Sequence, residues 1–182
     1  YIKIMSSYFD TDEIFPELNL IENYKNNIEK EIDNYNNWKQ WTEINLQDSN
    51  NGWKIIPIYG FDKWTLASNS FTNLKEFISK INNVKLVIIS RIEPNTVLSP
   101  HQGWGEHSNN VIRNHYCFTD IEDCGIWVEG IKKKYVQYNW LSFDDSKYHS
   151  AYNLSNKNRI VLIIDILRPT HIPKGNSKVL LT

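Results

Sequence analysis

The feature that most constrains the fold is a series of short apolar segments, separated by turns at a spacing of roughly ten residues. We expect strands at 84–92, 112–118, 125–129, 134–137, 140–143 and 159–167. Short strands at such regular spacing are typical of a sandwich, a jelly roll or a barrel. Residues 84–92 are too apolar for a strand with one solvent-facing side, and 160–167 are almost entirely apolar. The chain is therefore predicted to be mainly β.

The segments before residue 84 predict helices that flank this sheet. Between residues 16 and 41 apolar side chains recur every three or four positions, which indicates one amphipathic helix packed outside the sheet. A second helix is expected at 72–81 with Thr72 as its N-cap, and Pro57 favours an edge strand at 53–59. With no repeat or linker, we expect a single domain over 1–182, with a helical part at about 1–50 and a jelly-roll core at about 53–170.

Composition narrows the class of function. The 182 residues carry a net charge of −1, so no basic surface for nucleic acid or for a membrane is indicated. No apolar run reaches the roughly 18 residues of a membrane span, and the start lacks a signal-peptide core. We therefore expect a cytoplasmic protein in which Cys117 and Cys124 are free thiols. The oligomeric state is not indicated by the sequence.

Two histidine motifs suggest a metal site. The motif SPHQG displays His101 between a proline and Gly103, and the motif FDDSKYH ends at His149. The second motif places Asp144 and Asp145 just before its histidine, and a carboxylate near a ligating histidine commonly orients the ring. We predict that His101 and His149 bind one metal ion.

The third ligand is open on spacing alone. Non-haem iron oxygenases generally use two histidines and one carboxylate on one face of the metal. The carboxylate normally follows the first histidine by two residues, where this chain has Gly103. A three-ligand site would therefore need Glu106, Asp144 or Asp145 to take that place.

A cation on an apolar strand predicts an anion site. Arg159 opens the segment that continues IVLIIDI, and an arginine there is costly unless it meets an anion. The anion could be a ligand, or it could be Asp165 or Asp145 of the same chain.

The segment VIRNHYCF adds a second pair of polar side chains. Arg113 and His115 share one face of their predicted strand, because side chains alternate across it. If that face is internal, both line a pocket. The alternative would bury Asn114, and we consider it the weaker interpretation.

Together these motifs resemble the aspartyl/asparaginyl β-hydroxylase family. The resemblance rests on Ser90, SPHQG, the R-x-H pair at 113–115, FDDSKYH and RIVLIIDILRP, and covers roughly 53 to 169. It implies a double-stranded β-helix, the cupin-like jelly roll, with an Fe(II) centre, 2-oxoglutarate as cosubstrate and O2 as oxidant. Several members bind iron through two histidines alone and have glycine two residues after the first.

The resemblance also implies roles for individual residues. His101 and His149 would ligate iron, while Asp145 would hydrogen-bond a metal-bound water and Asp144 would be structural. Arg159 and Ser90 would hold the distal carboxylate of the cosubstrate. His115 and Arg113 would contact either the other carboxylate of the cosubstrate or the substrate. Trp104, Trp127 and Trp140 are candidates for pocket walls or for core packing.

The expected activity is hydroxylation of an unactivated C–H bond by an Fe(II)- and 2-oxoglutarate-dependent dioxygenase. The substrate could be a small molecule, a peptide or a protein side chain. Val111 replaces an arginine found in aspartyl-specific members, and the extra residues 104–108 fall where substrate would sit, so an aspartyl substrate is not specified. The alternatives are halogenation of a small molecule at the same site and a non-catalytic cupin-like binding module.

Overall fold

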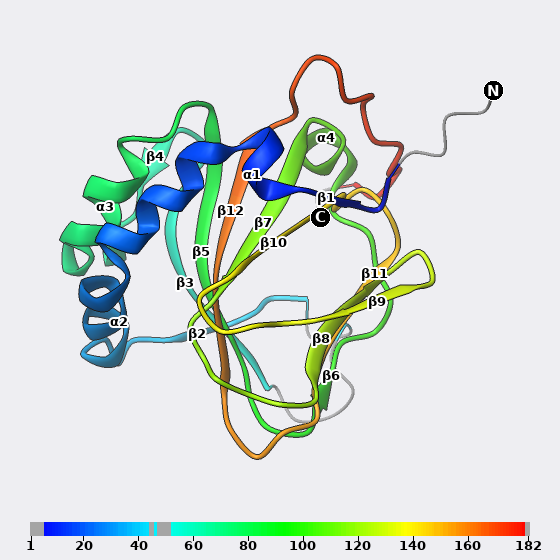
Figure 1. The fold of residues 1–182 in the computed structure, drawn as a ribbon. Coiled ribbons are helices and arrows are strands. Elements are labelled where there is room, and N and C mark those ends of the chain that lie inside the picture. Colours follow the sequence, from blue (N-terminus) through cyan, green and yellow to red (C-terminus); the bar gives the residue numbers. More distant parts are fainter. Residues whose placement is uncertain (1–5, 44–45, 47–51, 181–182) are drawn as a thin grey trace.

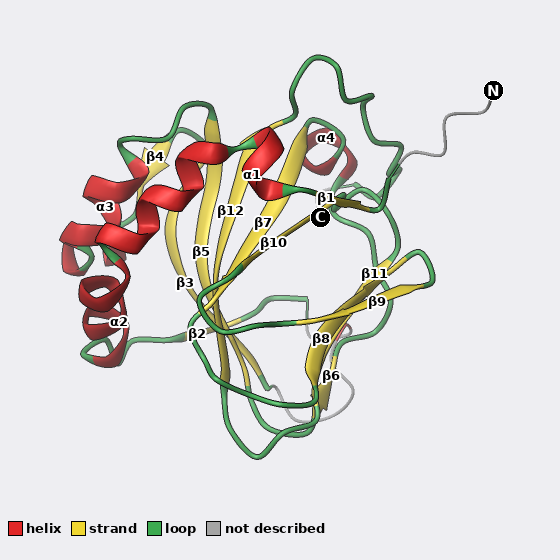
Figure 2. Cartoon of the chain, viewed as in Figure 1, coloured by secondary structure: helices red, strands yellow, loops and turns green. Residues whose placement is uncertain are grey.

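Two antiparallel sheets face each other and form a jelly roll, in a computed structural model that describes residues 6–43, 46 and 52–180 (Figures 1 and 2). The larger sheet has the order β1 (Tyr8–Phe9), β10 (Trp140–Phe143), β7 (Val111–Cys117), β12 (Arg159–Leu167), β5 (Val84–Ile92), β3 (Trp53–Gly60) and β2 (Lys39–Gln40), with β4 (Lys63–Trp64) paired to β3. The smaller sheet has the order β6 (Thr96–Val97), β11 (His149–Asn153), β8 (Cys124–Val128) and β9 (Ile131–Lys134). The mainly β prediction is confirmed.

The central strand β12 is apolar on both sides because both sides are covered. Leu162 and Ile164 pack in the core that the larger sheet shares with the helices. Val161 and Ile163 point the other way and pack against Ile126 and other residues of the smaller sheet. Side chains that alternate along a strand reach opposite faces, so odd-numbered residues of β12 face the space between the two sheets.

The helices gather on the outer face of the larger sheet (Figure 2). They are α1 (Thr11–Ile14), the 3-10 helix η1 (Pro16–Asn23), α2 (Lys25–Asp33), the 3-10 helix η3 (Ala67–Ser70) and α3 (Thr72–Ile78), while α4 (Gly105–Ser108) lies at one end of β7. The helix predicted to reach residue 41 ends at Asp33. Asparagines follow at once, and their side chains compete with helical backbone hydrogen bonds.

The N-terminus of α3 is capped from another helix. Thr72 was expected to be the N-cap, but it is the first helical residue, and the N-cap position belongs to Phe71, whose side chain makes no cap hydrogen bond. The Glu31 carboxylate of α2 instead accepts hydrogen bonds from the backbone N–H groups of Asn73 at 2.7 Å and Leu74 at 3.2 Å. The predicted inward face of this helix is confirmed, because Leu74, Phe77, Ile78 and Ile81 are all buried.

Pro57 sits where β3 has a neighbour on one side only. β2 pairs with Lys54 and Ile55, and β4 pairs with Tyr59 and Gly60, so Pro57 lies between the two short partners. On its other side β3 pairs with β5. The missing N–H of proline therefore removes no ladder bond on the outer side, as the edge-strand prediction anticipated.

Candidate functional site

A backbone bridge brings His101 and His149 together although they are far apart in sequence. His149 is the first residue of β11, and His101 pairs with it as an isolated antiparallel bridge. Each backbone N–H donates to the other residue's carbonyl oxygen at 2.9 Å. The two imidazole rings then lie on the same side, with centroids 4.3 Å apart. The pair expected from the two motifs is thus adjacent in space.

Both rings are held in the form that can bind a metal. The Nδ1 of His101 contacts the carbonyl oxygen of Ser99 at 2.7 Å, and the Nδ1 of His149 contacts that of Lys147 at 2.8 Å. A carbonyl oxygen only accepts, so each Nδ1 carries the proton and each Nε2 keeps a lone pair. Burial lowers the pKa of His101, and lowers that of His149 well below its ordinary value. Two neutral Nε2 donors are therefore available.

Asp145 fills the space that a side chain at residue 103 would need. A Cβ built on Gly103 would lie 1.9 Å from Asp145 Oδ2. Asp145 Oδ1 accepts from Arg113 at 2.5 Å and lies 3.5 Å from His149 Nε2. Its Oδ2 is buried and has no hydrogen-bond partner among the described residues. Burial raises the pKa of this carboxyl to about 6.

The other two carboxylates considered as a third ligand have different surroundings. Asp144 is bound by both terminal nitrogens of Arg168, at 2.8 and 3.0 Å, and Glu106 is exposed on α4. Within the described ranges no group of three or more His, Cys, Asp or Glu side chains is arranged to hold a metal. The donor set that remains is the histidine pair.

Arg113 joins two buried carboxylates. Its guanidinium donates to Asp145 and also, through Nε and Nη2, to Asp165 at 2.8 and 2.7 Å. His107 Nε2 contacts Asp165 at 2.7 Å. Although burial would raise the pKa of Asp165, the Arg113 charge outweighs it and holds that pKa well below its usual range. The sequence had suggested Asp165 or Asp145 as partners of Arg159, but both belong to Arg113.

Arg159 is a buried cation without a carboxylate. Its side chain lies on the inter-sheet face of β12, and the residue is 2% exposed. The guanidinium donates to the hydroxyl oxygens of Tyr135 and Ser90, each at 3.3 Å, and Trp53 Nε1 donates to Ser90 at 3.0 Å. Its Nε has no partner, and no carboxylate of the described chain pairs with it. A buried cation of this kind needs an anion.

Tyr135 is a site residue that the sequence did not reveal. It follows the end of β9, and its hydroxyl lies 2.7 Å from Nδ1 of His115 as well as near Arg159. Nε2 of His115 is buried with no partner among the described residues. The only signal in the sequence was an aromatic residue directly after three lysines, which does not distinguish this role from an exposed strand end.

The orientation expected for β7 holds, but one reason given for it was wrong. Arg113 and His115 lie on the face that bears Asp145 and Tyr135. Asn114 is nevertheless fully buried on the opposite face, because helices cover it. Its amide donates to the carbonyls of Ile112 and Ile164, and its oxygen accepts from Ser142. A satisfied amide can be buried at little cost.

The buried polar atoms that lack hydrogen-bond partners match the metal ion and the dicarboxylate cosubstrate that the family resemblance implies. Among them are Asp145 Oδ2, which can accept, and His115 Nε2 and Arg159 Nε on the inter-sheet face. Unsatisfied buried polar atoms are rare in native proteins and call for a ligand or water. Two neutral imidazole donors fit a divalent metal ion, and an unpaired arginine fits a carboxylate. The residues present therefore fit an iron centre with a dicarboxylate cosubstrate.

The tryptophans expected as pocket walls separate into different places. Trp140 packs on Tyr116 on the helix-covered face, and its Nε1 donates to the carbonyl of Leu18. Trp127 alternates with the inward-facing Ile126 and Val128, so it points away from the inter-sheet core. Trp104 lies nearly parallel to Trp41, which stacks on Trp53 near His101. Core packing, the other alternative for these tryptophans, holds for Trp140, whereas Trp127 does not face the space between the sheets.

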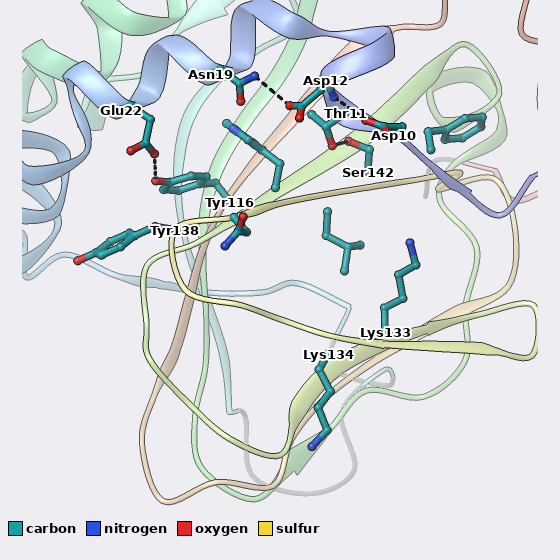
Figure 3. A pocket seen from close by; sticks show the side chains of 14 residues that line it. Asp10, Thr11, Asp12, Asn19, Glu22, Tyr116, Lys133, Lys134, Tyr138 and Ser142 are labelled. Carbon is teal, nitrogen blue, oxygen red and sulfur yellow. Dashed lines mark hydrogen bonds between the residues drawn. The ribbon is translucent and has the colours of Figure 1, made fainter.

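A pocket of about 380 Å³ lies away from the histidine pair and Arg159, between α1, β10 and the end of β9, and Trp140 is among its lining residues (Figure 3). Its acidic side chains already have partners: Asp10 caps α1, Asp12 accepts from Asn19, and Glu22 accepts from Tyr116. None of its lining residues has a buried polar atom without a partner.

Comparison with known families agrees with the geometry. Residues 22–169 match the profile of the family described as Aspartyl/Asparaginyl beta-hydroxylase. The chain belongs to this family. A curated relative, the ornithine lipid ester-linked acyl 2-hydroxylase of Rhizobium tropici, is 26% identical over 136 residues. That match covers 72% of this chain and 47% of the relative, so the chain spans about half the relative's length.

Solved structures that match the chain at low sequence identity include the following two. One is a predicted oxalate decarboxylase from Thermotoga maritima, with a TM-score of 0.48 and 13% identity, covering 72% of this chain and 92% of that one. The other is an oxidoreductase of the 2OG-Fe(II) oxygenase family from Burkholderia pseudomallei, with a TM-score of 0.48 and 8% identity, covering 74% of this chain and 76% of that one.

None of the helices in the described ranges has the length and apolarity needed to cross a membrane.

Proposed function

We propose that this member of the β-hydroxylase family is an Fe(II)- and 2-oxoglutarate-dependent hydroxylase. His101 and His149 would hold the metal, and Arg159 with Ser90 would receive the distal carboxylate of 2-oxoglutarate. The observation that carries the proposal is Arg159, a cation buried to 2% exposure with no carboxylate partner in the described chain. A guanidinium in that state has a strong preference for an anionic ligand.

The chain's own residues would bind and orient the metal ion and the cosubstrate, and they would keep water out of the site. Iron and 2-oxoglutarate would supply the oxidising chemistry, with O2 as oxidant. The carbonyls of Ser99 and Lys147 keep both histidine Nε2 atoms unprotonated. Asp145, fixed by Arg113, would accept a hydrogen bond from water beside the ligands through its free Oδ2.

Succinate release tests the proposal. Purified protein supplied with Fe(II), 2-oxoglutarate and O2 should release succinate, and His149→Ala should lower that rate by about a hundredfold or more, because one of two ligands is lost. His171→Ala, which removes an exposed histidine, is the matched control and should behave as wild type. Equal succinate formation by wild type and His149→Ala would refute the metal assignment.

The two alternative functions, halogenation and non-catalytic binding, have separate tests. A halogenase would form chlorinated product at high chloride, whereas succinate without chlorinated product excludes it. A non-catalytic binding module would release no succinate, and failure to bind iron at near-stoichiometric levels under anaerobic conditions would favour that alternative.

An apolar chain, such as a lipid acyl group, is the substrate class that the surroundings of His101 favour. Trp41 stacks on Trp53 with centroids 4.6 Å apart, and Trp104 lies nearly parallel to Trp41 at 6.3 Å. Trp53 in turn lies 6.3 Å from the ring of His101. Arg113 lies beside the histidine pair and is already neutralised by two carboxylates, so it is not free to recognise an aspartyl side chain.

Substrate-dependent consumption of 2-oxoglutarate would test this class. Lipids with ester-linked acyl chains in mixed micelles should stimulate turnover more than aspartyl peptides do. Trp104→Ala should remove most of that stimulation, whereas Trp64→Ala, at an exposed tryptophan on β4, should not. Stimulation by aspartyl peptides alone would exclude an apolar substrate.

A further inference from the structure

The Tyr135 hydroxyl is placed between a buried arginine and a buried histidine. Arg159 Nη1 lies 3.3 Å from the hydroxyl oxygen, and Nδ1 of His115 lies 2.7 Å from it. Tyr135, His115 and Arg159 are 6%, 5% and 2% exposed, so water does not compete freely for these contacts. The phenol and imidazole rings are nearly parallel, at 17°.

The direction of each hydrogen bond follows from what each group can do. A guanidinium only donates, so the Tyr135 oxygen accepts from Arg159. The phenol proton then needs an acceptor, and Nδ1 of His115 is the one that the described residues provide. Leaving a buried hydroxyl proton unpaired is unfavourable, because its lost hydration is not replaced. Nδ1 therefore accepts, and a neutral imidazole must carry its single proton on Nε2.

We propose that Tyr135 is a positioning residue that fixes His115 as the Nε2–H tautomer, so that the ring presents an N–H donor to an anionic oxygen of the cosubstrate. The tautomer follows from the chain alone, while the identity of the anion rests on the function proposed above. This arrangement is opposite to that of His101 and His149, whose protons lie on Nδ1. One tautomer prepares a ring to bind metal, and the other prepares a ring to donate to an anion.

The electrostatics are consistent with this assignment. Burial, with the nearby charges of Arg159 and Arg113, lowers the pKa of His115 well below its ordinary value, although Asp165 acts in the opposite direction. Burial likewise raises the pKa of Tyr135. The phenol therefore keeps the proton that it donates. The Nε2–H has no partner within the described residues, which leaves it free for a ligand oxygen.

Nitrogen NMR of histidine-labelled protein, without metal or cosubstrate, tests the tautomer directly. In wild type the His115 signals should show a protonated Nε2 and an unprotonated Nδ1. In Tyr135→Phe the ring should lose this preference and populate both tautomers. Tyr138→Phe, which removes a hydroxyl bonded to Glu29 on the outer face, is the control and should leave the His115 signals unchanged. A protonated Nδ1 in wild type, or identical populations in Tyr135→Phe, would overturn the proposal.

Substitutions of His115 test the donor itself. Glutamine can place an amide N–H near the position of Nε2, whereas asparagine places it near Nδ1. Calorimetry with Mn(II)-loaded protein should show 2-oxoglutarate binding weakened about tenfold in His115→Asn and much less in His115→Gln. Equal weakening in both would overturn the role of Nε2–H. If wild type binds no 2-oxoglutarate but shows the expected tautomer, the cosubstrate proposal fails and the assignment to Tyr135 stands.

Discussion

Asp145 and residue 103 compete for one position beside the histidines. A Cβ on residue 103 would lie 1.9 Å from Asp145 Oδ2 and 2.8 Å from Ser108 Cβ. A carboxylate two residues after His101 and the observed placement of Asp145 are therefore mutually exclusive. In this chain Asp145, a carboxylate within the second motif, takes the space that Gly103 of the first motif leaves open, and there it pairs with Arg113.

A double-mutant cycle tests this exclusion. Gly103→Ala should destabilise the fold by about 1–3 kcal/mol through overcrowding, and Asp145→Ala should also destabilise it because Arg113 loses a partner. The double variant should be more stable than the sum of the two losses predicts, by about 1 kcal/mol or more, since the clash with Asp145 is gone and only the approach to Ser108 remains. Chemical denaturation measures all four proteins. Strict additivity would contradict the shared position.

Single residues differ in how far the sequence could reveal them. His101, His149 and Arg159 stand in motifs with fixed spacing, and Arg159 is conspicuous as a charge at the start of an apolar strand. Tyr135 and Asp165 could not be assigned in this way. Their partners lie on strands distant in sequence, and the pairing of Arg113 with Asp165 depends on the alignment of β7 with β12.

At the scale of elements, the hydrophobic pattern identified the buried strands but missed the strand that carries His149. The predicted 84–92, 140–143 and 159–167 coincide with β5, β10 and β12. β11 lies outside the predicted strands because its serine, asparagine and tyrosine residues give it no apolar pattern. Its polar groups are satisfied in place: Asn153 donates to the carbonyls of Ile92, Glu93 and Lys157. Tertiary hydrogen bonds, which local pattern does not encode, define this strand.

The contact between α2 and α3 gives a prediction at this scale. Glu31→Ala should destabilise the protein by about 1 kcal/mol, because two backbone N–H groups at the start of α3 lose their acceptor. For a chain of this size the melting temperature should fall by about 2–4 °C. Glu122→Ala, at an exposed glutamate, is the matched control. A melting temperature equal to that of the control would show that Glu31 does not act as a cap.

For the whole molecule, the candidate site is divided between the two sheets. Arg159, Ser90, Arg113 and His115 lie on strands of the larger sheet, whereas His149 lies on β11 of the smaller one. β11 pairs with β6 and β8 of its own sheet and with no strand of the larger sheet in the described chain, and apolar side chains of both sheets also pack between them. A metal ion with a bound dicarboxylate would therefore connect groups on both sheets, and its binding would oppose their separation on unfolding.

This division predicts that ligands stabilise the fold in two separable steps. Mn(II) with 2-oxoglutarate at about a hundred times its Kd should raise the melting temperature of wild type by about 5–10 °C. His149→Ala should lose the response to both. Arg159→Met should keep the response to metal and lose the response to 2-oxoglutarate. Without ligands, that variant should be at least as stable as wild type, because it removes a buried charge that has no carboxylate partner in the described chain. A full response to 2-oxoglutarate in Arg159→Met would place the anion site elsewhere in the chain.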